Sequence, residues 1–123
     1  GKLANAHSDL AKRYHELGLY AQAIAEYDMA LALCPGFPDI HNKRSVSCRE
    51  MGDLAGARAS LLRALELNPQ YVEAYVNLGL VYRKLGDMPE AATMWGRALE
   101  INPAHPLARI YLNQASAGPP PTG

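Results

Sequence analysis

Histidine and cysteine are the residues of this sequence that could most readily carry catalysis or hold a metal ion, and their spacing decides which chemistry is open to them. His7 and His15 lie eight positions apart and no H-E-x-x-H pair occurs, so the two-histidine arrangement of a zinc protease is missing. Cys48 follows His41 by seven positions, two turns along one helix, which makes a Cys–His dyad geometrically conceivable. The sequence favours a packing role for Cys48, because it falls in an inward-facing column of the repeat described below.

Other catalytic and metal-binding patterns are missing as well. Cys34 and Cys48 form no C-x-x-C pair, and we expect two reduced thiols, one near a turn and one within a helix. Ser45 and Ser47 stand outside any G-x-S-x-G context, and no G-x-x-x-x-G-K-[ST] loop is present. The sequence therefore predicts a protein that is not an enzyme and that needs no metal or other cofactor.

Charge and composition restrict the partners. The chain has 123 residues, with 12 Lys and Arg against 12 Asp and Glu, so its formal net charge is zero. This balance argues against a nucleic-acid binder, which carries a basic excess to neutralise phosphates, and against a polybasic membrane anchor. No apolar run is long enough to insert in a membrane, and the beginning, GKLANAHSDL, lacks the apolar core of a signal peptide. We expect a cytoplasmic location, and the abrupt start leaves open that the chain is part of a longer protein.

The elements that must position these side chains follow a repeat of 34 residues. Large, small, glycine and proline positions recur at this step in three copies without an insertion. A fixed period in this range indicates stacked supersecondary units. The columns are Gly18, Gly52 and Gly86; Ala23, Ala57 and Ala91; Tyr27, Leu61 and Trp95; Ala30, Ala64 and Ala98; and Pro35, Pro69 and Pro103.

Each unit is predicted to be a pair of helices. In the third unit, residues 72–85 place large apolar side chains at steps of three and four, as on one face of a helix. Gly86 can adopt the left-handed conformation that ends a helix, and Asp87 with Glu90 forms a capping box for the next one. That second helix is expected over residues 88–101.

Small residues surround the one tryptophan of the third unit. Two antiparallel helices approach closely only where their side chains are small, and Ala91 and Ala98 facing Gly79 would provide that gap. We expect Trp95 to fill the space between this helix pair and the next element.

This pattern resembles the tetratricopeptide repeat. The second unit departs most from it, with Arg44, Ser45 and Cys48 where leucine, glycine and tyrosine are expected. The resemblance covers residues 4–105 and implies an all-α fold, a right-handed superhelical α-solenoid of three antiparallel helix pairs. The motif in the third unit is carried by Tyr75, Leu78, Gly79, Tyr82, Ala91, Trp95, Ala98 and Pro103.

The resemblance also implies how the chain is divided. Repeats are expected at about 4–37, 38–71 and 72–105, with a seventh, capping helix at about 106–117 that covers the last apolar face. These parts would form a single domain over residues 1–117, followed by a flexible Pro/Gly-rich tail over 118–123.

The first helix of each pair is implied to line a concave groove that binds a partner protein. Its columns combine a basic ladder (Lys12, His15, Arg49 and Arg83), an apolar centre and an acidic margin of Asp39 and Glu73. The expected groove residues are Ser8, Lys12, His15, Asn42, Val46, Arg49, Val76, Leu80, Arg83 and Ile110.

The hypothesis is a non-enzymatic adaptor that binds a peptide with acidic and apolar character. Any single charge could equally be ordinary solvated surface, but Arg49 and Arg83 in one column repel each other unless a partner answers them. Carboxylates of the ligand would meet these arginines, and apolar anchors would enter near Val76 and Leu80.

The resemblance also assigns particular residues to a chaperone C-terminal carboxylate clamp, and this sequence lacks them. The five corresponding columns hold Ser8, Lys12, Lys43, Glu73 and Asn77, none of which matches, so we expect no such clamp. Two alternatives stay open, namely a scaffold that self-associates through the ends of the solenoid and a regulatory fragment of a larger protein.

Overall fold

The computed structural model describes residues 1–117, and seven helices account for most of them. No strand occurs in this range, so the predicted all-α fold is confirmed. The helices are α1 (Lys2–Glu16), α2 (Tyr20–Leu33), α3 (Pro38–Met51), α4 (Leu54–Leu67), α5 (Val72–Lys84), α6 (Met88–Ile101) and α7 (Pro106–Ala117). The tail predicted over residues 118–123 lies outside the described range.

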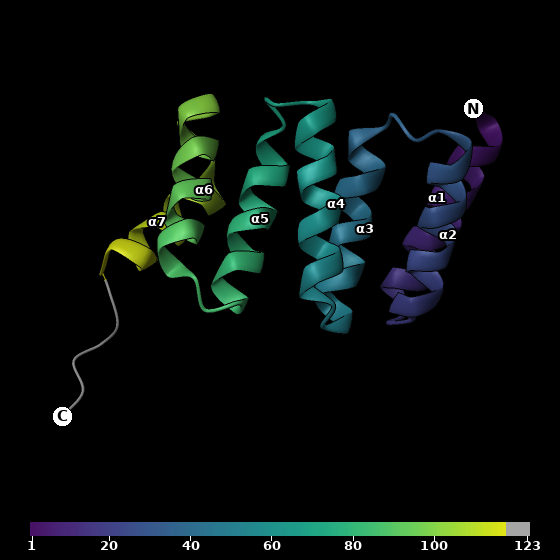
Figure 1. The fold of residues 1–123 in the computed structure, drawn as a ribbon, viewed down its shortest axis with the longest axis horizontal. Helices are drawn as coiled ribbons and strands as arrows, with labels where there is room; N and C mark the ends of the chain where they lie inside the picture. Colours follow the sequence, from purple (N-terminus) through teal and green to yellow (C-terminus); the bar gives the residue numbers. More distant parts are fainter. Residues whose placement is uncertain (118–123) are drawn as a thin grey trace.

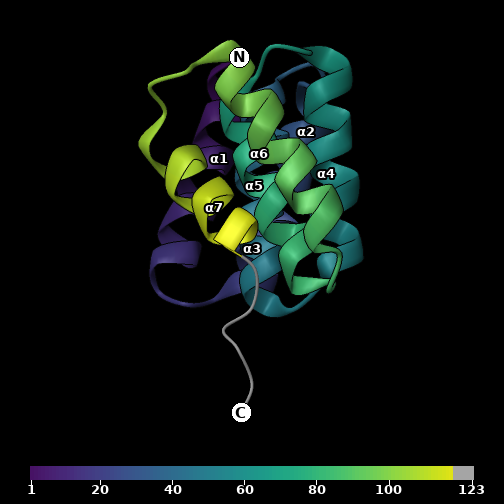
Figure 2. The same ribbon diagram turned by 90° about the vertical axis from the view of Figure 1, so that its left-hand side faces the viewer.

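The helices form an open row of pairs and not a closed bundle. Figure 1 shows α1/α2, α3/α4 and α5/α6 standing side by side in chain order, with the N-terminus at one end of the row and α7 at the other. Each helix packs mainly against its neighbours in the sequence, and α3 also contacts α5. Viewed along the row, α7 lies beside α6 at the near end (Figure 2). This is the α-solenoid that the repeat predicted.

The turn inside each pair depends on a glycine. Gly18, Gly52 and Gly86 have φ angles of 77°, 89° and 83°, and no other residue with a positive φ occurs in the described part of the chain. This left-handed conformation is unfavourable for residues with a Cβ atom, so the glycine column sets the sharp reversal between the two helices of a pair.

Side-chain caps follow two of these turns. The Asp53 carboxylate accepts a hydrogen bond from the Gly56 amide at 2.9 Å, and the Asp87 carboxylate accepts one from the Glu90 amide at 3.1 Å. Leu19 precedes α2 and offers no side-chain acceptor, so α2 begins without such a cap. The difference follows from the sequence, which has Leu19 where the second and third repeats have Asp53 and Asp87.

The alanine columns lie where the paired helices touch. Ala23, Ala57 and Ala91, like Ala30, Ala64 and Ala98, have exposed fractions of 0%. Gly79 provides the closest approach, because a Cβ atom built on it would lie 2.3 Å from Nε1 of Trp95. That indole nitrogen donates a hydrogen bond to the Val76 carbonyl at 3.2 Å. Trp95 therefore requires the glycine opposite it, as the small residues around it indicated.

The irregular second repeat contains a polar cluster where the other repeats are apolar. Arg44 donates from Nε to Asp28 at 2.7 Å and from Nη1 to Ser60 at 2.7 Å, and Nη1 also lies 3.6 Å from Sγ of Cys48. Burial raises the pKa of the Cys48 thiol, and the nearby guanidinium of Arg44 opposes that shift. Arg44 thus replaces an apolar contact with hydrogen bonds to the first and second repeats.

One contact recurs at every junction between units. A side chain near the start of α3, α5 and α7 donates a hydrogen bond to the carbonyl of the column proline six residues earlier. Because α7 makes the same contact, it continues the 34-residue phase. The pairs are His41–Pro35 at 3.1 Å, Tyr75–Pro69 at 3.2 Å and Arg109–Pro103 at 3.4 Å.

Candidate functional site

The predicted groove residues come from α1, α3, α5 and α7, and we call the surface formed by these helices the first-helix face. Between α1 and α3 this face has a hollow of about 180 Å³, the Lys12 hollow. It brings together four of the ten predicted residues, and it adds Tyr27 and Lys43, which the prediction of the groove did not include. Its lining is Lys12, His15, Tyr27, Asn42, Lys43 and Val46.

The Lys12 hollow combines a cationic rim with a buried floor. Lys12 and Lys43 are exposed, whereas Tyr27 is buried and Val46 is half-buried. Burial raises the pKa of the Tyr27 hydroxyl, and the negative charge of Glu16 adds to the shift, so this phenol stays neutral. The hollow therefore offers an apolar surface below two ammonium groups.

His15 is held at one side of this hollow by contacts within the chain. Its Nδ1 lies 2.9 Å from the Ser47 hydroxyl, in a hydrogen bond that joins α1 to α3. Its ring meets Tyr20 edge-on, with centroids 5.1 Å apart. His15 is thus a fixed wall that packs the two helices together.

A second hollow of about 220 Å³ adjoins the first, and we call it the Asp39 hollow. Lys43 lines both hollows, so they are neighbours along the face. Phe37 is 43% exposed at this position, which leaves an aromatic edge available to a partner. Ser8, a predicted groove residue, lines the hollow but is buried. The full lining is Asn5, Ser8, Asp9, Phe37, Asp39, Ile40 and Lys43.

Between α3 and α5 the face is bridged by Asn77. Its amide nitrogen donates to Oδ1 of Asn42 at 2.9 Å, and its amide oxygen accepts from Arg49 at 3.4 Å. The Arg49 side chain is 14% exposed and its guanidinium also lies 3.9 Å from the Glu50 carboxylate. These contacts tie the second repeat to the third and occupy the polar groups that the groove prediction assigned to a ligand.

Between α5 and α7 the face is covered by stacked side chains. The Arg83 guanidinium carbon lies 5.7 Å from the Trp95 ring and 5.2 Å from the Tyr111 ring, distances typical of cation–π contacts. The two rings are themselves 5.3 Å apart. Arg49 and Arg83 therefore each contact side chains of this chain. Their position in one repeat column does not by itself require a ligand to offset the repulsion between them.

The residues of the predicted apolar centre differ in how much surface they expose. Val76 is only 2% exposed and packs with Ala98 and Ala108, so it offers almost no surface of its own to the apolar anchor predicted to enter near Val76 and Leu80. Packing of α7 on α5 and α6 buries it. Leu80 is half-buried, and Ile110 on α7 is 49% exposed.

The two residues of the predicted acidic margin, Asp39 and Glu73, differ in whether they are paired. His105 donates from Nε2 to the Glu73 carboxylate at 2.8 Å and accepts the Ala108 amide at Nδ1, which caps the start of α7. Glu73 is thereby engaged in holding the capping helix. Asp39 has no ion-pair partner among residues 1–117.

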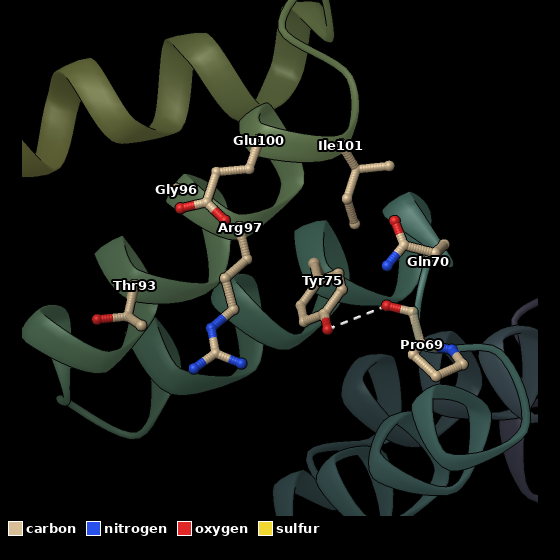
Figure 3. Close-up of a pocket in the computed structure, with 8 residues that line it drawn as sticks. All are labelled: Pro69, Gln70, Tyr75, Thr93, Gly96, Arg97, Glu100 and Ile101. Carbon is tan, nitrogen blue, oxygen red and sulfur yellow. Dashed lines mark hydrogen bonds between the residues drawn. The ribbon is translucent and has the colours of Figure 1, made fainter.

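A larger hollow of about 530 Å³ lies away from the predicted residues, where α6 meets α5 and the loop before it (Figure 3). Tyr75 donates to the Pro69 carbonyl at one side, while Arg97 and Glu100 extend from α6 (Figure 3). A Cβ atom on Gly96 would meet nothing within 4 Å, so this glycine leaves the hollow open without being required by packing. Gly96, a glycine inside a helix, is the sequence feature that coincides with this hollow.

The possible Cys–His dyad is not formed. Nε2 of His41 donates to the Pro35 carbonyl at 3.1 Å, whereas Cys48 is fully buried beside Arg44. Both cysteines are free thiols, Cys48 buried and Cys34 half-buried. No helix within residues 1–117 has the length and apolar character needed to cross a bilayer.

Comparison with known families agrees with the repeat geometry. The sequence pattern described as TPR repeat matches residues 11–45 and 47–86, and that described as tetratricopeptide repeat matches residues 72–105. The chain belongs to the tetratricopeptide repeat (TPR) family. TPR domains are a protein-interaction fold, which supports the predicted class of function. No sequence among curated proteins matches the chain.

Several solved TPR domains have nearly the same structure. The first TPR domain of Spaghetti (RPAP3) bound to the HSP90 peptide SRMEEVD is 25% identical, with a TM-score of 0.89 over 94% of this chain and 92% of that one. The second TPR domain of human RPAP3, in complex with the HSP70 peptide SGPTIEEVD, is 20% identical, with a TM-score of 0.87 over 94% and 96%. The Arabidopsis OM64 TPR domain is 17% identical, with a TM-score of 0.90 over 94% and 96%.

These neighbours correct one expectation. The exclusion of a chaperone-tail clamp was wrong, because TPR domains of nearly the same structure bind chaperone peptides. The comparison of five columns tested one particular set of residues. A carboxylate needs only cations and hydrogen-bond donors within reach, and other positions of the same face can supply them.

Proposed function

We propose that this TPR domain binds a short acidic segment of a partner protein on its first-helix face, with a carboxylate held at the rim of the Lys12 hollow. The observation that carries the proposal is the pair of exposed lysines above an apolar floor. Lys12 and Lys43 form no ion pair within residues 1–117. Their charges are therefore available to a ligand, whereas the Arg49 side chain is 14% exposed and donates a hydrogen bond to Asn77.

Shape and chemistry select the same class of ligand. A hollow of about 180 Å³ accommodates one side chain rather than a whole small molecule. Tyr27 and Val46 favour an apolar side chain there, while the ammonium groups of Lys12 and Lys43 favour a neighbouring carboxylate. An extended peptide presents both groups within one or two residues.

The likeness to the RPAP3 domain supports an acidic C-terminal peptide as the first probe. The heptapeptide SRMEEVD carries four carboxylates at its end, and the domain that it binds is 25% identical to this chain. Binding is measured by fluorescence anisotropy with the labelled peptide, and a peptide with an amidated C-terminus measures the contribution of the terminal carboxylate.

The matched variants use the four lysines of the chain. Lys12→Ala with Lys43→Ala should weaken binding by about 10- to 100-fold, since a hydrogen bond to a charged group contributes about 1.5–3 kcal/mol. Lys2→Ala with Lys84→Ala removes the same charge elsewhere and should change affinity less than about threefold, because those charges lie in solvent. Equal effects of the two double variants would reduce the proposal to non-specific attraction.

Self-association is the second candidate function, because α7 leaves Leu107 46% exposed and Ile110 49% exposed at the end of the row. Light scattering at increasing concentration separates the two functions, since the peptide-binding adaptor is monomeric when alone. The absence of enzymatic activity, the division into repeats 4–37, 38–71 and 72–105, and the cytoplasmic location are parts of this proposal.

A further inference from the structure

The two hollows between α1 and α3 carry opposite charges. Lys12 and Lys43 lie at the Lys12 hollow, whereas Asp9 and Asp39 lie at the Asp39 hollow, with Lys43 between them. All four side chains are exposed, and none forms an ion pair within residues 1–117. The open part of the face is thus dipolar rather than simply basic.

The spacing of these charges would permit pairing within each helix. Asp9 and Lys12 are three residues apart on α1, and Asp39 and Lys43 are four apart on α3, both distances at which opposite charges on a helix can meet. In the structure no carboxylate oxygen of this group lies within 4.0 Å of an ammonium nitrogen. Asp9 and Asp39 line the Asp39 hollow, Lys12 lines the Lys12 hollow and Lys43 lines both, so the four charges are available to a ligand.

We infer that the preferred ligand is a dipolar peptide, in which a lysine or arginine binds at Asp9 and Asp39 while an acidic residue binds at Lys12 and Lys43. The inference rests on the proposed function and deepens it, because it names a second subsite and the chemistry of its occupant. Phe37, 43% exposed at the Asp39 hollow, provides an aromatic surface for the aliphatic part of the basic side chain.

The position of the hollows restricts the separation of the two ligand charges. Both hollows include Lys43, so they adjoin on the surface. An extended chain advances about 3.3–3.6 Å per residue, so two to four positions span about 7–14 Å, and we infer this short separation for two hollows that share a residue. A basic residue placed farther away would pass beyond the Asp39 hollow.

A peptide array tests the pattern without assuming a natural ligand. Heptapeptides in a Ser/Leu background carry one Glu and one Arg at every pair of positions, and matched sets carry Glu alone or Arg alone. We expect the peptides whose basic residue lies about two to four positions from the acidic one to bind best. Equal binding of the Glu-only set would overturn the inference and leave the proposed function intact, whereas an absence of binding in every set would end both.

A mutant cycle then assigns the basic residue to the aspartates. The best array peptide and its Arg-to-Ala counterpart are titrated against the wild-type domain and the Asp9→Asn, Asp39→Asn variant. Loss of two exposed ion pairs should weaken the arginine peptide by about 3- to 10-fold, and the alanine peptide should bind the variant as well as or better than the wild type. The opposite signs distinguish pairing from a general change of charge.

Controls separate binding from folding. Asp39 lies in the first turn of α3, where a carboxylate favours the helix, so the melting temperature of the variant is measured alongside. The charge-reversed Asp9→Lys variant provides a second arm, since it should favour a peptide with Glu at the former Arg position. If the two peptides lose the same factor in both variants, the aspartates are not a subsite.

Discussion

The two ends of the first-helix face are built from the same repeat columns but differ in what those columns do. Between α1 and α3, Lys12 and Lys43 surround open hollows and have no ionic partner within residues 1–117. Between α5 and α7, Arg83 lies over Trp95 and Tyr111. The position of a residue in a TPR column therefore does not determine whether its charge is available, because neighbouring repeats decide what it contacts.

The column of His15, Arg49 and Arg83 shows this most directly. The first hydrogen-bonds with Ser47, the second donates to Asn77, and the third stacks on two aromatic rings. Each uses its polar or cationic group to join one unit to the next. Three of the four residues of the basic ladder thus make contacts between units, whereas the fourth, Lys12, forms no ion pair within residues 1–117.

The largest expected effect comes from removing the aromatic support of the closed end. Trp95→Ala deletes a fully buried side chain that bonds to the Val76 carbonyl, and it should lower the free energy of unfolding by about 3–5 kcal/mol. Urea denaturation measures the loss, and Leu62→Ala, at a 44% exposed position, serves as the control with a small effect. Similar losses for both variants would mean that the closed end does not depend on Trp95.

Gly79→Ala probes the same packing from the opposite helix. The added Cβ atom would lie 2.3 Å from Trp95, so we expect a loss of about 1–3 kcal/mol from overpacking. Gly96→Ala is the matched control, because its Cβ atom meets nothing within 4 Å and should stabilise α6 by about 0.5–1 kcal/mol. Thermal melts of the two variants should shift in opposite directions, and shifts in the same direction would contradict this account.

A substitution of Arg83 should affect mainly stability, and a substitution of Lys12 should affect mainly binding. Arg83→Gln removes two cation–π contacts and should lower the free energy of unfolding by about 0.5–1 kcal/mol, with the affinity for SRMEEVD almost unchanged. Lys12→Gln should weaken that affinity and leave the melting temperature nearly the same. If Arg83→Gln weakened binding as much as Lys12→Gln, the closed end would have to be part of the binding surface.

The smallest expected effect concerns the middle repeat at alkaline pH. Burial raises the pKa of Cys48 above its ordinary value of 9.0, so the folded protein holds this proton more tightly than the unfolded chain. The corresponding stability is fully present below about pH 9 and is lost as the pH rises through the folded pKa. Cys48→Ala should therefore lose less stability than the wild type as the pH is raised from about 8 into the alkaline range, measured as urea midpoints. Identical losses would show that Cys48 does not titrate in that range.

Much of the fold could be predicted because it depends on contacts that repeat locally. Gly86 ends α5, Asp87 caps α6 and the alanine columns mark the helix contacts, all of which follow from residues close together in the sequence. The site was harder, because its accessibility depends on neighbours in other units. Val76 is covered through α7, and Asn77 occupies Arg49 from the next repeat. Neither of these contacts can be predicted from the pattern of repeat columns.

The error about chaperone peptides has a similar physical origin. It compared residue identities at five fixed columns, whereas a carboxylate responds to the positions of cations in space. Lys43 was considered at only one of those columns, although it stands between two hollows together with residues from both α1 and α3. Lys43 becomes noticeable only in the three-dimensional arrangement of unpaired charges on the first-helix face.

The hydrogen bond from Arg109 to the Pro103 carbonyl has a practical consequence for engineering. Since α7 is joined to α6 by the same link that places α3 and α5, a designed second helix and further hairpins could be grafted after it in register. Such an extended array would lengthen the first-helix face by one helix per added unit, and the spacing between α1 and α3 would remain untouched.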